Sequence, residues 1–374
     1  MTTILAAAQE TGAANALAPV IKELDRRVGV NVVVAAAGNA ARVFVSEGIK
    51  HQRVGLPGKH DGREMDGIRE LLAGTSPHLL LLGTAWGQSL DKLLLRVASG
   101  DVPSISIVDT WSYFAERFTD PRTGERVFPT RVAVADEWAL EEAVQHGFPR
   151  HLLVATGQPH LDMLPARVQD PEISQQAQRL RRNWLRTASV ENSRRIVLFA
   201  SEAFTRHAGP STPYYRGYTE IDGLEGLVEA VQCVEKTTNL RIEVVLKLHP
   251  EESPNFFCPG PRAIQRGVRV VADQPSLPCI LAADVIVGMV SMFLIEASVA
   301  LKPAISFQPG LHGRDGFVGS RIGLMPVASS VQELTQLLDE YLTNAGTTRR
   351  NPPFTRGDAA SRIADMALEL TSFC

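Results

Sequence analysis

The sequence predicts an α/β protein of two doubly wound domains that face each other across a cleft. Two observations predict this fold class. Along all 374 residues, short apolar runs alternate with longer segments of helical periodicity, which is typical of parallel strands joined by crossover helices. The length also exceeds that of one ordinary core. We therefore expect domains at 1–160 and 161–354, and a helix at 355–374 that packs back on the first domain.

The composition is that of a soluble globular protein, and it argues against several classes of partner. Hydrophobic residues make up 44% of the chain and charged residues 21%, which is ordinary for a globular domain. The net charge of −3 gives no general attraction for nucleic acid or an anionic membrane. Apolar runs are too short to cross a bilayer, so we expect no transmembrane segment. The four cysteines lack CxxC spacing, which favours reduced thiols and a cytoplasmic protein, free or peripheral at the inner face of the membrane.

The short apolar runs of the first domain are interpreted as buried strands of a parallel sheet. They are expected at Thr3–Ala8, Val30–Ala36, Gln52–Val54, His78–Leu82, Ser104–Val108, Arg131–Ala135 and Leu152–Ala155. Helical segments separate them, so each strand–helix pair is one unit of a doubly wound sheet. The turn at 9–15 lacks the GxGxxG pattern, which argues against a dinucleotide-binding fingerprint.

Polar and aromatic side chains follow three of these strands. Glu10 follows the first strand, Thr84 and Trp86 follow the fourth, and Asp109 and Trp111 follow the fifth. Ligands of open α/β sheets bind at the carboxyl ends of the strands. Aromatic ring faces near a carboxylate suit a sugar, so Thr84, Trp86 and Trp111 are candidates for binding an acceptor. The alternative is a solvated turn carboxylate and tryptophans that pack between the domains.

The second domain contains the segment on which the functional argument depends, VVLKLHPEES at 244–253. An apolar strand ends here in Lys247 and His249, and Pro250 stops it. Lys247 and His249 are two residues apart, so they project from the same face of a strand. A cation and an imidazole at a strand tip suit a phosphate. The alternative is a solvated lysine and an ordinary hydrogen-bonded histidine.

The second domain also contains a strand–turn–helix unit. Strands are expected at Arg195–Ala200, Val268–Val271, Val285–Val287 and Ala304–Phe307. Between the last two, Ser291 is a natural N-cap for a helix that runs to Leu301. A helix N-terminus after a strand offers free N–H groups and the helix dipole to an anion. The alternative is that Ser291 only caps the helix.

The Lys-x-His-Pro tip and the serine-initiated helix resemble those of GT-B transferases that use cytidine-nucleotide donors. These include bacterial sialyltransferases and polysialyltransferases, capsule Kdo transferases, and glycerophosphotransferases of teichoic acid synthesis. The resemblance covers 195–327 and implies two Rossmann-like domains. It implies that His249 and Ser291 contact the donor phosphate or nucleotide, with Lys247 beside them. It also implies that Glu296, in the first helical turns, binds the donor ribose.

Two further loops join the expected donor site. In GT-B transferases the loop after the first strand of the second domain faces the donor phosphates, which implies that Arg206 binds the donor. The loop after the strand that ends at Phe307 is polar, and Gln308 at its start is a candidate to line the cleft. The alternative for Arg206 is a solvated loop residue.

The function expected from the resemblance is an inverting, metal-independent glycosyltransferase or polyol-phosphate transferase of polysaccharide or glycoconjugate biosynthesis. Its nucleotide-activated sugar donor is a substrate, and no other cofactor is expected. The sequence has no DxD pair, which argues against a metal-bridged diphosphate. The expected acceptor is a saccharide, a lipid-linked molecule or a protein, and the chain acts alone or as a homodimer.

Such a transfer needs a group that takes the proton of the acceptor hydroxyl. Glu10, Asp109 and Asp136 are the candidates, and the sequence leaves the choice among them open. His249 is the other catalytic candidate, because with Lys247 it would stabilise the leaving phosphate as negative charge develops.

Two other functions stay open. The first is a non-hydrolysing UDP-N-acetylglucosamine 2-epimerase, a family that shares the fold. That family has a His-Arg-rich loop and an Asp-Ser-Gly-Gly helix start, whereas this chain reads Gly-Met-Val-Ser-Met at 288–292, which disfavours the option. The second is a non-catalytic protein that binds nucleotide sugars. Epimerases interconvert two sugar nucleotides, transferases slowly hydrolyse their donor, and a sensor only binds.

Overall fold

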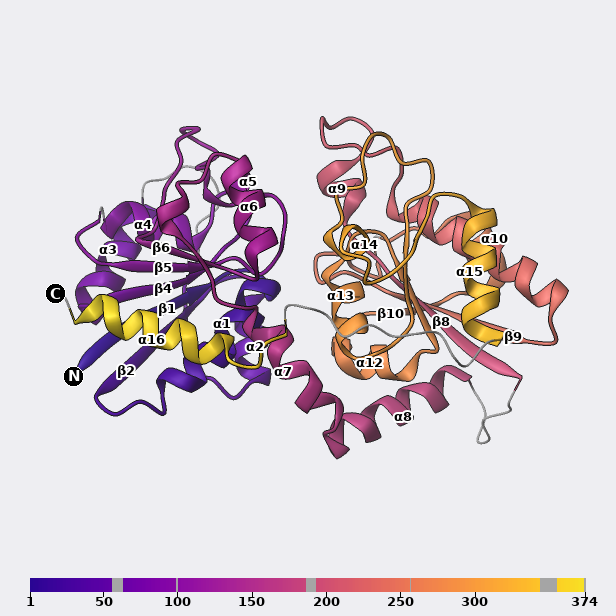
Figure 1. The fold of residues 1–374 in the computed structure, drawn as a ribbon, viewed down its shortest axis with the longest axis horizontal. Coiled ribbons are helices and arrows are strands. Elements are labelled where there is room, and N and C mark those ends of the chain that lie inside the picture. The colour runs from indigo at the N-terminus through magenta and orange to yellow at the C-terminus, as the bar shows by residue number, and fades with distance from the viewer. Residues whose placement is uncertain (56–62, 99, 186–192, 256, 344–354, 373–374) are drawn as a thin grey trace. The chain divides into compact units, whose positions relative to one another are not determined.

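The chain divides into two compact units in the computed structural model, which describes residues 1–55, 63–98, 100–185, 193–255, 257–343 and 355–372 (Figure 1). Unit 1 comprises Met1–Met163 and Pro353–Cys374, and unit 2 comprises Leu164–Pro352. Among the described residues, no helix is long and apolar enough to cross a membrane.

Unit 1 is built on a seven-stranded parallel sheet with the strand order β3-β2-β1-β4-β5-β6-β7. The chain winds outward from β1 to β3, returns to β4 beside β1, and winds outward again to β7, which is the doubly wound order. The strands are β1 (Thr2–Ala8), β2 (Val30–Ala36), β3 (Gln52–Arg53), β4 (Leu79–Gly83), β5 (Ser104–Ile107), β6 (Arg131–Val134) and β7 (Leu153–Ala155).

Helices cover both faces of this sheet (Figure 1). Successive residues of a strand point to opposite faces. Ile4 and Ala6 of β1 therefore pack with α1, α2 and α16, whereas Leu5 and Ala7 pack with α3 and α4. The helices are α1 (Thr11–Leu24), α2 (Ala40–Ser46), α3 (Arg63–Thr75), α4 (Leu90–Ala98), α5 (Phe114–Phe118), α6 (Glu137–Gln145), a 3-10 turn at Arg150–Leu152, α7 (Pro159–Val168), which contains the boundary between the units, and α16 (Ala359–Thr371).

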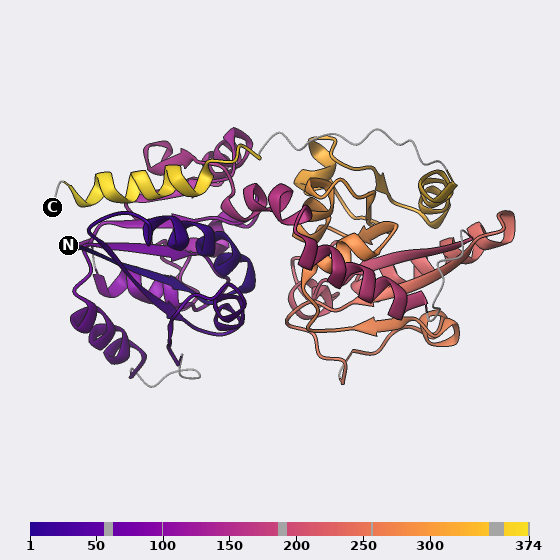
Figure 2. The same cartoon turned by 90° about the horizontal axis from the view of Figure 1, so that it is seen from below.

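The C-terminal helix α16 packs on α1 within unit 1 (Figure 2). Arg27, just after α1, forms an ion pair with Asp365 of α16 at 3.1 Å. The carboxylate of Asp162 in α7 accepts hydrogen bonds from the backbone N–H groups of Arg356 and Ala359. These contacts fix where α16 begins and which face it covers.

Unit 2 repeats the architecture with a six-stranded parallel sheet of order β10-β9-β8-β11-β12-β13. The strands are β8 (Arg194–Ala200), β9 (Arg241–Lys247), β10 (Arg269–Val271), β11 (Val285–Gly288), β12 (Ala304–Phe307) and β13 (Val327–Ala328). The helices are α8 (Pro171–Leu185), α9 (Phe204–Ala208), α10 (Glu220–Thr237), α11 (Pro261–Arg266), α12 (Ser276–Ala282), α13 (Met292–Val299), α14 (Val318–Arg321) and α15 (Val331–Thr343). The two parallel, doubly wound sheets confirm the predicted fold class.

Two glycines allow α10 to lie close to the sheet of unit 2. A Cβ atom on Gly223 would lie 2.9 Å from the ring of Phe199 in β8, and one on Gly226 would lie 2.8 Å from the ring of Phe307 in β12. Those distances are shorter than ordinary carbon contacts. The helix therefore depends on glycine at both positions to reach its packing distance.

Helix α13 is shorter than the sequence predicts. It ends at Val299, and Leu301 adopts a left-handed backbone with φ of 56°. The N–H of Lys302 then bonds to the carbonyl of Ala297 at 2.9 Å. This closure satisfies a terminal carbonyl in the way that a glycine usually does, with leucine in its place.

Candidate functional site

The carboxyl ends of β1, β4 and β5 bring together the polar residues predicted for the first domain. These three strands are adjacent in the sheet, so the residues that follow them meet at one edge. Glu10 comes from the β1–α1 turn, Thr84 and Trp86 from the β4–α4 loop, and Asp109 from the loop after β5. Gln158, after β7, donates a hydrogen bond to the carbonyl of Asp109 at 3.2 Å.

Arg117 of α5 connects these residues. Its Nη1 atom donates to Oδ1 of Asp109 at 3.0 Å, to Oγ1 of Thr84 at 3.0 Å, and to the carbonyl of Thr84 at 3.3 Å. Arg117 is 7% exposed and Asp109 is 8% exposed, so this ion pair is largely shielded from solvent. A buried pair of this kind needs its remaining polar atoms satisfied to be stable.

Glu10 is a carboxyl group at this edge whose pKa is perturbed. Burial raises the pKa of Glu10 above its ordinary value, while the charge of Arg117 and a 3.0 Å hydrogen bond from the N–H of Trp86 oppose the rise. Carboxyl groups used for proton transfer near neutral pH have pKa values raised in this way.

The β4–α4 loop is held at three successive residues by charged side chains. Arg117 binds Thr84, and Glu10 binds the N–H of Trp86. Between them, the buried Lys92 donates to the carbonyl of Ala85 at 2.5 Å. Burial lowers the pKa of Lys92, although nearby carboxylates oppose this. The loop therefore has a defined shape before any ligand binds.

The two tryptophans predicted to bind an acceptor have different surroundings. The ring of Trp86 lies edge-on to that of Tyr113, with centroids 4.6 Å apart. Trp111 is buried, and its Nε1 atom donates to both carboxylate oxygens of Asp136 at 3.0 Å. Asp136, the third candidate base, also caps α6 by accepting from the N–H of Ala139. The indole N–H of Trp111 and the carboxylate of Asp136 are thus hydrogen-bonded to each other inside unit 1.

In unit 2, Lys247 ends β9 and His249 follows it. Lys247 is buried, with Nζ 5.7 Å from the centre of the Phe293 ring. The backbone N–H of His249 donates to Glu252 at 2.7 Å, and its Nδ1 atom accepts from the N–H of Glu251 at 3.3 Å. The second contact assigns the ring proton of neutral His249 to Nε2.

The turn between β11 and α13 carries the expected N-cap together with a residue that the sequence did not single out. Ser291 accepts a hydrogen bond from the N–H of Phe293 at 3.1 Å, so the capping role is confirmed. The amides of Met289 and Val290 donate to Oε1 of Glu202, at 3.2 and 2.7 Å. A carboxylate of the chain therefore lies on the turn where a ligand anion was expected.

Glu202 comes from the loop after β8, where the sequence analysis had selected Arg206. Burial raises the pKa of Glu202 to about 7, against the two amide hydrogen bonds and the charge of Arg216. The signal available in the sequence was a single acidic residue after a strand, which by itself does not separate a site residue from a solvated one. Arg206 is exposed and lies 3.8 Å from Glu251.

Glu296 and Gln308 are buried side chains of unit 2. Glu296 lies in α13 and is 8% exposed. Gln308 follows β12, donates to Ser306 at 3.0 Å and to Asp315 at 2.9 Å, and accepts from the hydroxyl of Tyr218. Its amide is committed to contacts within the chain, so Gln308 orders the surrounding loops.

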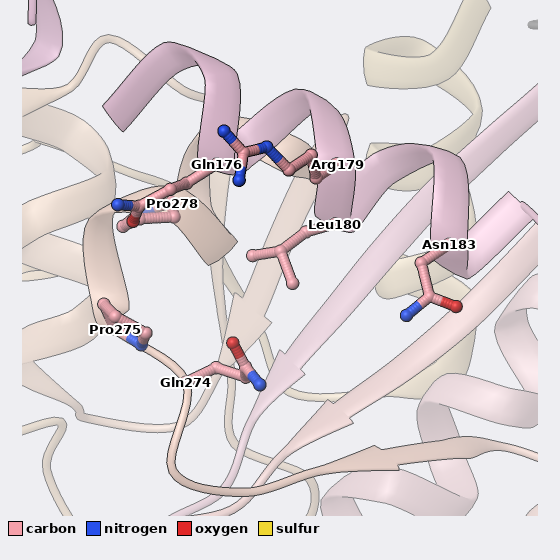
Figure 3. Close-up of a pocket in the computed structure, with 7 residues that line it drawn as sticks. All are labelled: Gln176, Arg179, Leu180, Asn183, Gln274, Pro275 and Pro278. Carbon is pink, nitrogen blue, oxygen red and sulfur yellow. The ribbon is translucent and has the colours of Figure 1, made fainter. Parts of the chain in front are cut away.

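A shallow cavity of about 280 Å³ lies elsewhere in unit 2 (Figure 3). It is lined by α8 and by the loop that leads into α12. The lining residues are Gln176, Arg179, Leu180, Asn183, Gln274, Pro275 and Pro278, which include none of the predicted site residues.

No protein-family model and no curated protein matches the chain, whereas solved structures match it over its whole length. A UDP-GlcNAc 2-epimerase from Neisseria meningitidis, solved with UDP-GlcNAc, has a TM-score of 0.71 at 15% identity, and the match covers 98% of this chain and 100% of that one. An epimerase from Methanocaldococcus jannaschii has a TM-score of 0.68 at 13% identity, over 99% and 100%. A glycosyltransferase from Rickettsia africae has a TM-score of 0.59 at 14% identity, and the match covers 100% of this chain and 93% of that one. The chain therefore has the two-domain, GT-B-like α/β fold of these proteins.

The comparison corrects the expected function. The prediction of an inverting glycosyltransferase is wrong, because several solved structures that match the whole chain, with TM-scores up to 0.71, are UDP-GlcNAc 2-epimerases. The Lys-x-His-Pro tip and the serine-capped helix follow strands of a parallel sheet, where ligands of open α/β sheets bind whatever the reaction is, so they do not separate the two classes. The resemblance to cytidine-donor transferases also lacks support, since the ligands named for these structures are UDP-GlcNAc and UDP.

The contact between Gly12 and Asp109 yields a testable prediction. A Cβ atom on Gly12 would lie 2.0 Å from Oδ2 of Asp109, so Gly12→Ala must displace that carboxylate from Arg117. We expect the free energy of unfolding to fall by up to about 4 kcal/mol, because a buried charge loses its partner. Urea denaturation measures this. Gly67→Ala is the matched control, since Gly67 lies in α3 with no atom within 4 Å of the added carbon; it should gain up to about 1 kcal/mol. Equal changes in the two variants would contradict the role of Gly12.

The raised pKa of Glu202 predicts how stability depends on pH. The pKa of Glu202 is about 7 in the folded protein, against an ordinary value of 4.5. The folded protein therefore loses stability as the pH rises between those two values. Glu202→Gln keeps an acceptor for the two amides and cannot ionise. Its stability relative to the native chain should therefore increase from pH 5 to pH 8, by up to about 3 kcal/mol.

Urea denaturation at several pH values checks this prediction, with Glu333→Gln as the control. Hydrogen bonds from Ser329 lower the pKa of Glu333, so that variant should gain nothing over the same pH range. A constant difference between Glu202→Gln and the native chain at all pH values would contradict the assignment.

Proposed function

We propose that this protein binds a UDP-linked 2-acetamido sugar and inverts the sugar at C2, as UDP-GlcNAc 2-epimerases do. The observation that carries the proposal is the cluster of Glu10, Arg117 and Asp109 at the carboxyl edge of unit 1. The fold, shared over the whole chain with epimerases that include one bound to UDP-GlcNAc, supports the same reading.

Inversion at C2 requires two proton transfers on opposite faces of the sugar ring. One group removes the C2 proton, and another returns a proton from the other side. Glu10 and Asp109 are suited to the two roles because their environments differ. Burial raises the pKa of Glu10 and favours its protonated form, whereas Asp109 is ion-paired with Arg117.

The proposal also gives a role to unit 2. The C2 hydrogen of a nucleotide sugar is not acidic by itself, so its removal is coupled to departure of the UDP group from C1, and re-addition of UDP follows protonation of C2. Lys247, His249 and the Ser291 turn are the groups of unit 2 suited to bind a diphosphate. We assign them the binding role expected from the sequence, with a uridine nucleotide as the ligand.

A specific observation favours one other function, a protein that binds nucleotide sugars without converting them. The helix start at Ser291 departs from the Asp-Ser-Gly-Gly pattern of the epimerases, and Glu202 holds both amides of the preceding turn. A protein of this kind would bind UDP-GlcNAc and leave it unchanged, so one assay separates the two functions.

The assay is incubation with UDP-GlcNAc in D₂O, followed by NMR. We expect the C2 epimer, UDP-N-acetylmannosamine, to form with deuterium at C2, because the returning proton comes from a group that exchanges with solvent. Glu10→Gln should slow this by about 10²- to 10⁴-fold and leave UDP affinity unchanged. Binding of UDP-GlcNAc with neither epimer nor deuterium would identify the non-catalytic alternative. Full activity of Glu10→Gln would exclude Glu10 from proton transfer.

A second prediction separates the capping role of Ser291 from a phosphate-binding role. Asn and Asp are both good N-caps, so Ser291→Asn and Ser291→Asp should melt at similar temperatures without ligand. If the turn holds a phosphate, the Asp variant places a negative charge against it, at a cost on the order of a few kcal/mol. Calorimetric titration with UDP should then show much weaker binding by Ser291→Asp than by Ser291→Asn. Equal affinities would restrict Ser291 to capping.

A further inference from the structure

Arg117 has a buried N–H group for which none of the described residues provides a hydrogen-bond acceptor. Its Nε atom is buried and has no hydrogen-bond partner among them. The contacts of the same side chain with Thr84 and Asp109 are all made by Nη1. Leaving a buried N–H of a charged group unpaired is costly, and a ligand that supplied an acceptor there would remove that cost.

The shape of the guanidinium group determines which N–H donors such an acceptor can contact. The group is planar, and Nε and Nη2 form one edge with two parallel donors. The Nη1 contacts fix this plane against Thr84 and Asp109. Within the part of the chain that the structure describes, every hydrogen bond of Arg117 is made by Nη1, and the Nε–Nη2 edge is not used. One oxygen can accept from both donors of that edge.

We propose that Arg117 binds the substrate through its Nε–Nη2 edge, and that the group it binds is the acetamido carbonyl oxygen at C2 of the sugar. This inference rests on the proposed function and names the residue that selects the sugar. Arg117 would favour a 2-acetamido sugar over a 2-hydroxy sugar. Since its other donor binds Asp109, it would also hold C2 beside a group proposed to transfer protons.

The charges around Arg117 favour a neutral acceptor over an anionic one. Glu10, Asp91 and Asp109 surround two cations, Arg117 and Lys92. Burial raises the pKa values of Glu10 and Asp91, so this edge already disfavours added negative charge. An amide carbonyl satisfies the donors without adding charge, whereas a sugar carboxylate would add one.

Binding of UDP, UDP-GlcNAc and UDP-glucose to the full chain tests the inference. We expect the native protein to prefer UDP-GlcNAc over UDP-glucose by about 10- to 100-fold, the effect of a hydrogen bond to a charged donor. Arg117→Lys keeps the charge but lacks the two-donor edge, so its preference should fall to within about threefold of unity while UDP affinity is retained. Circular dichroism checks the fold of each variant. If Arg117→Lys does not fold, Arg117→Gln, which keeps an amide donor for Thr84 and Asp109, is measured in its place.

Arg96→Lys is the matched control, because it makes the same exchange at an arginine of the same unit that pairs with Asp120. This control should keep the sugar preference of the native protein. A preference that survives in folded Arg117 variants, or one that is absent from the native chain despite UDP binding, overturns the role of Arg117 alone. Failure of the native chain to bind either UDP or UDP-GlcNAc instead overturns the proposed function on which the inference rests.

Discussion

The carboxyl edge of unit 1 depends on the contacts of one nitrogen atom, Nη1 of Arg117. This atom joins the end of β4, at Thr84, to the end of β5, at Asp109. The arrangement is possible only because residue 12 lacks a side chain and leaves space for the Asp109 carboxylate. Three separate segments of the chain, at Thr84, Asp109 and Gly12, are thus held in one fixed arrangement. Because charges at a shielded site reorganise little, this constraint gives Glu10 a fixed electrostatic environment.

Unit 2 satisfies its own hydrogen-bond donors with carboxylates. Glu202 accepts from the amides of Met289 and Val290, and Glu252 accepts from the N–H of His249 and from the hydroxyl of Ser201. These donors are thereby held in directions that an anionic oxygen requires. If unit 2 binds the diphosphate as proposed, a phosphate oxygen would replace a carboxylate oxygen at donors that are already oriented. The raised pKa of Glu202, about 7, would favour its leaving the turn as a neutral group.

The sequence predicts most of the fold because most strands are buried apolar runs that alternate with segments of helical periodicity. The same logic predicts that Glu10 and Asp109 lie at one edge of a parallel sheet and that Ser291 caps a helix, as the structure has them. It does not find Glu202, because a single loop acid has no periodic pattern. Nor does it find that Trp111 is paired with Asp136, since that contact joins two loops. The reaction class is missed for a related reason. Short motifs at strand ends indicate the ligand-binding edge of an α/β sheet, but they do not indicate which bond of the ligand is broken.

The return of α16 to unit 1 sets an order for folding during synthesis. Unit 2 is continuous in sequence, so it can complete its sheet as soon as β13 and α15 leave the ribosome. Unit 1 cannot, because Ile363 and Ala367 cover apolar surface of α1 and the sheet and are made only after the whole of unit 2. The nascent first unit therefore keeps an uncovered hydrophobic face until α16 has been synthesised. A chain released early would expose that face, which makes truncated products natural targets for chaperones and proteases.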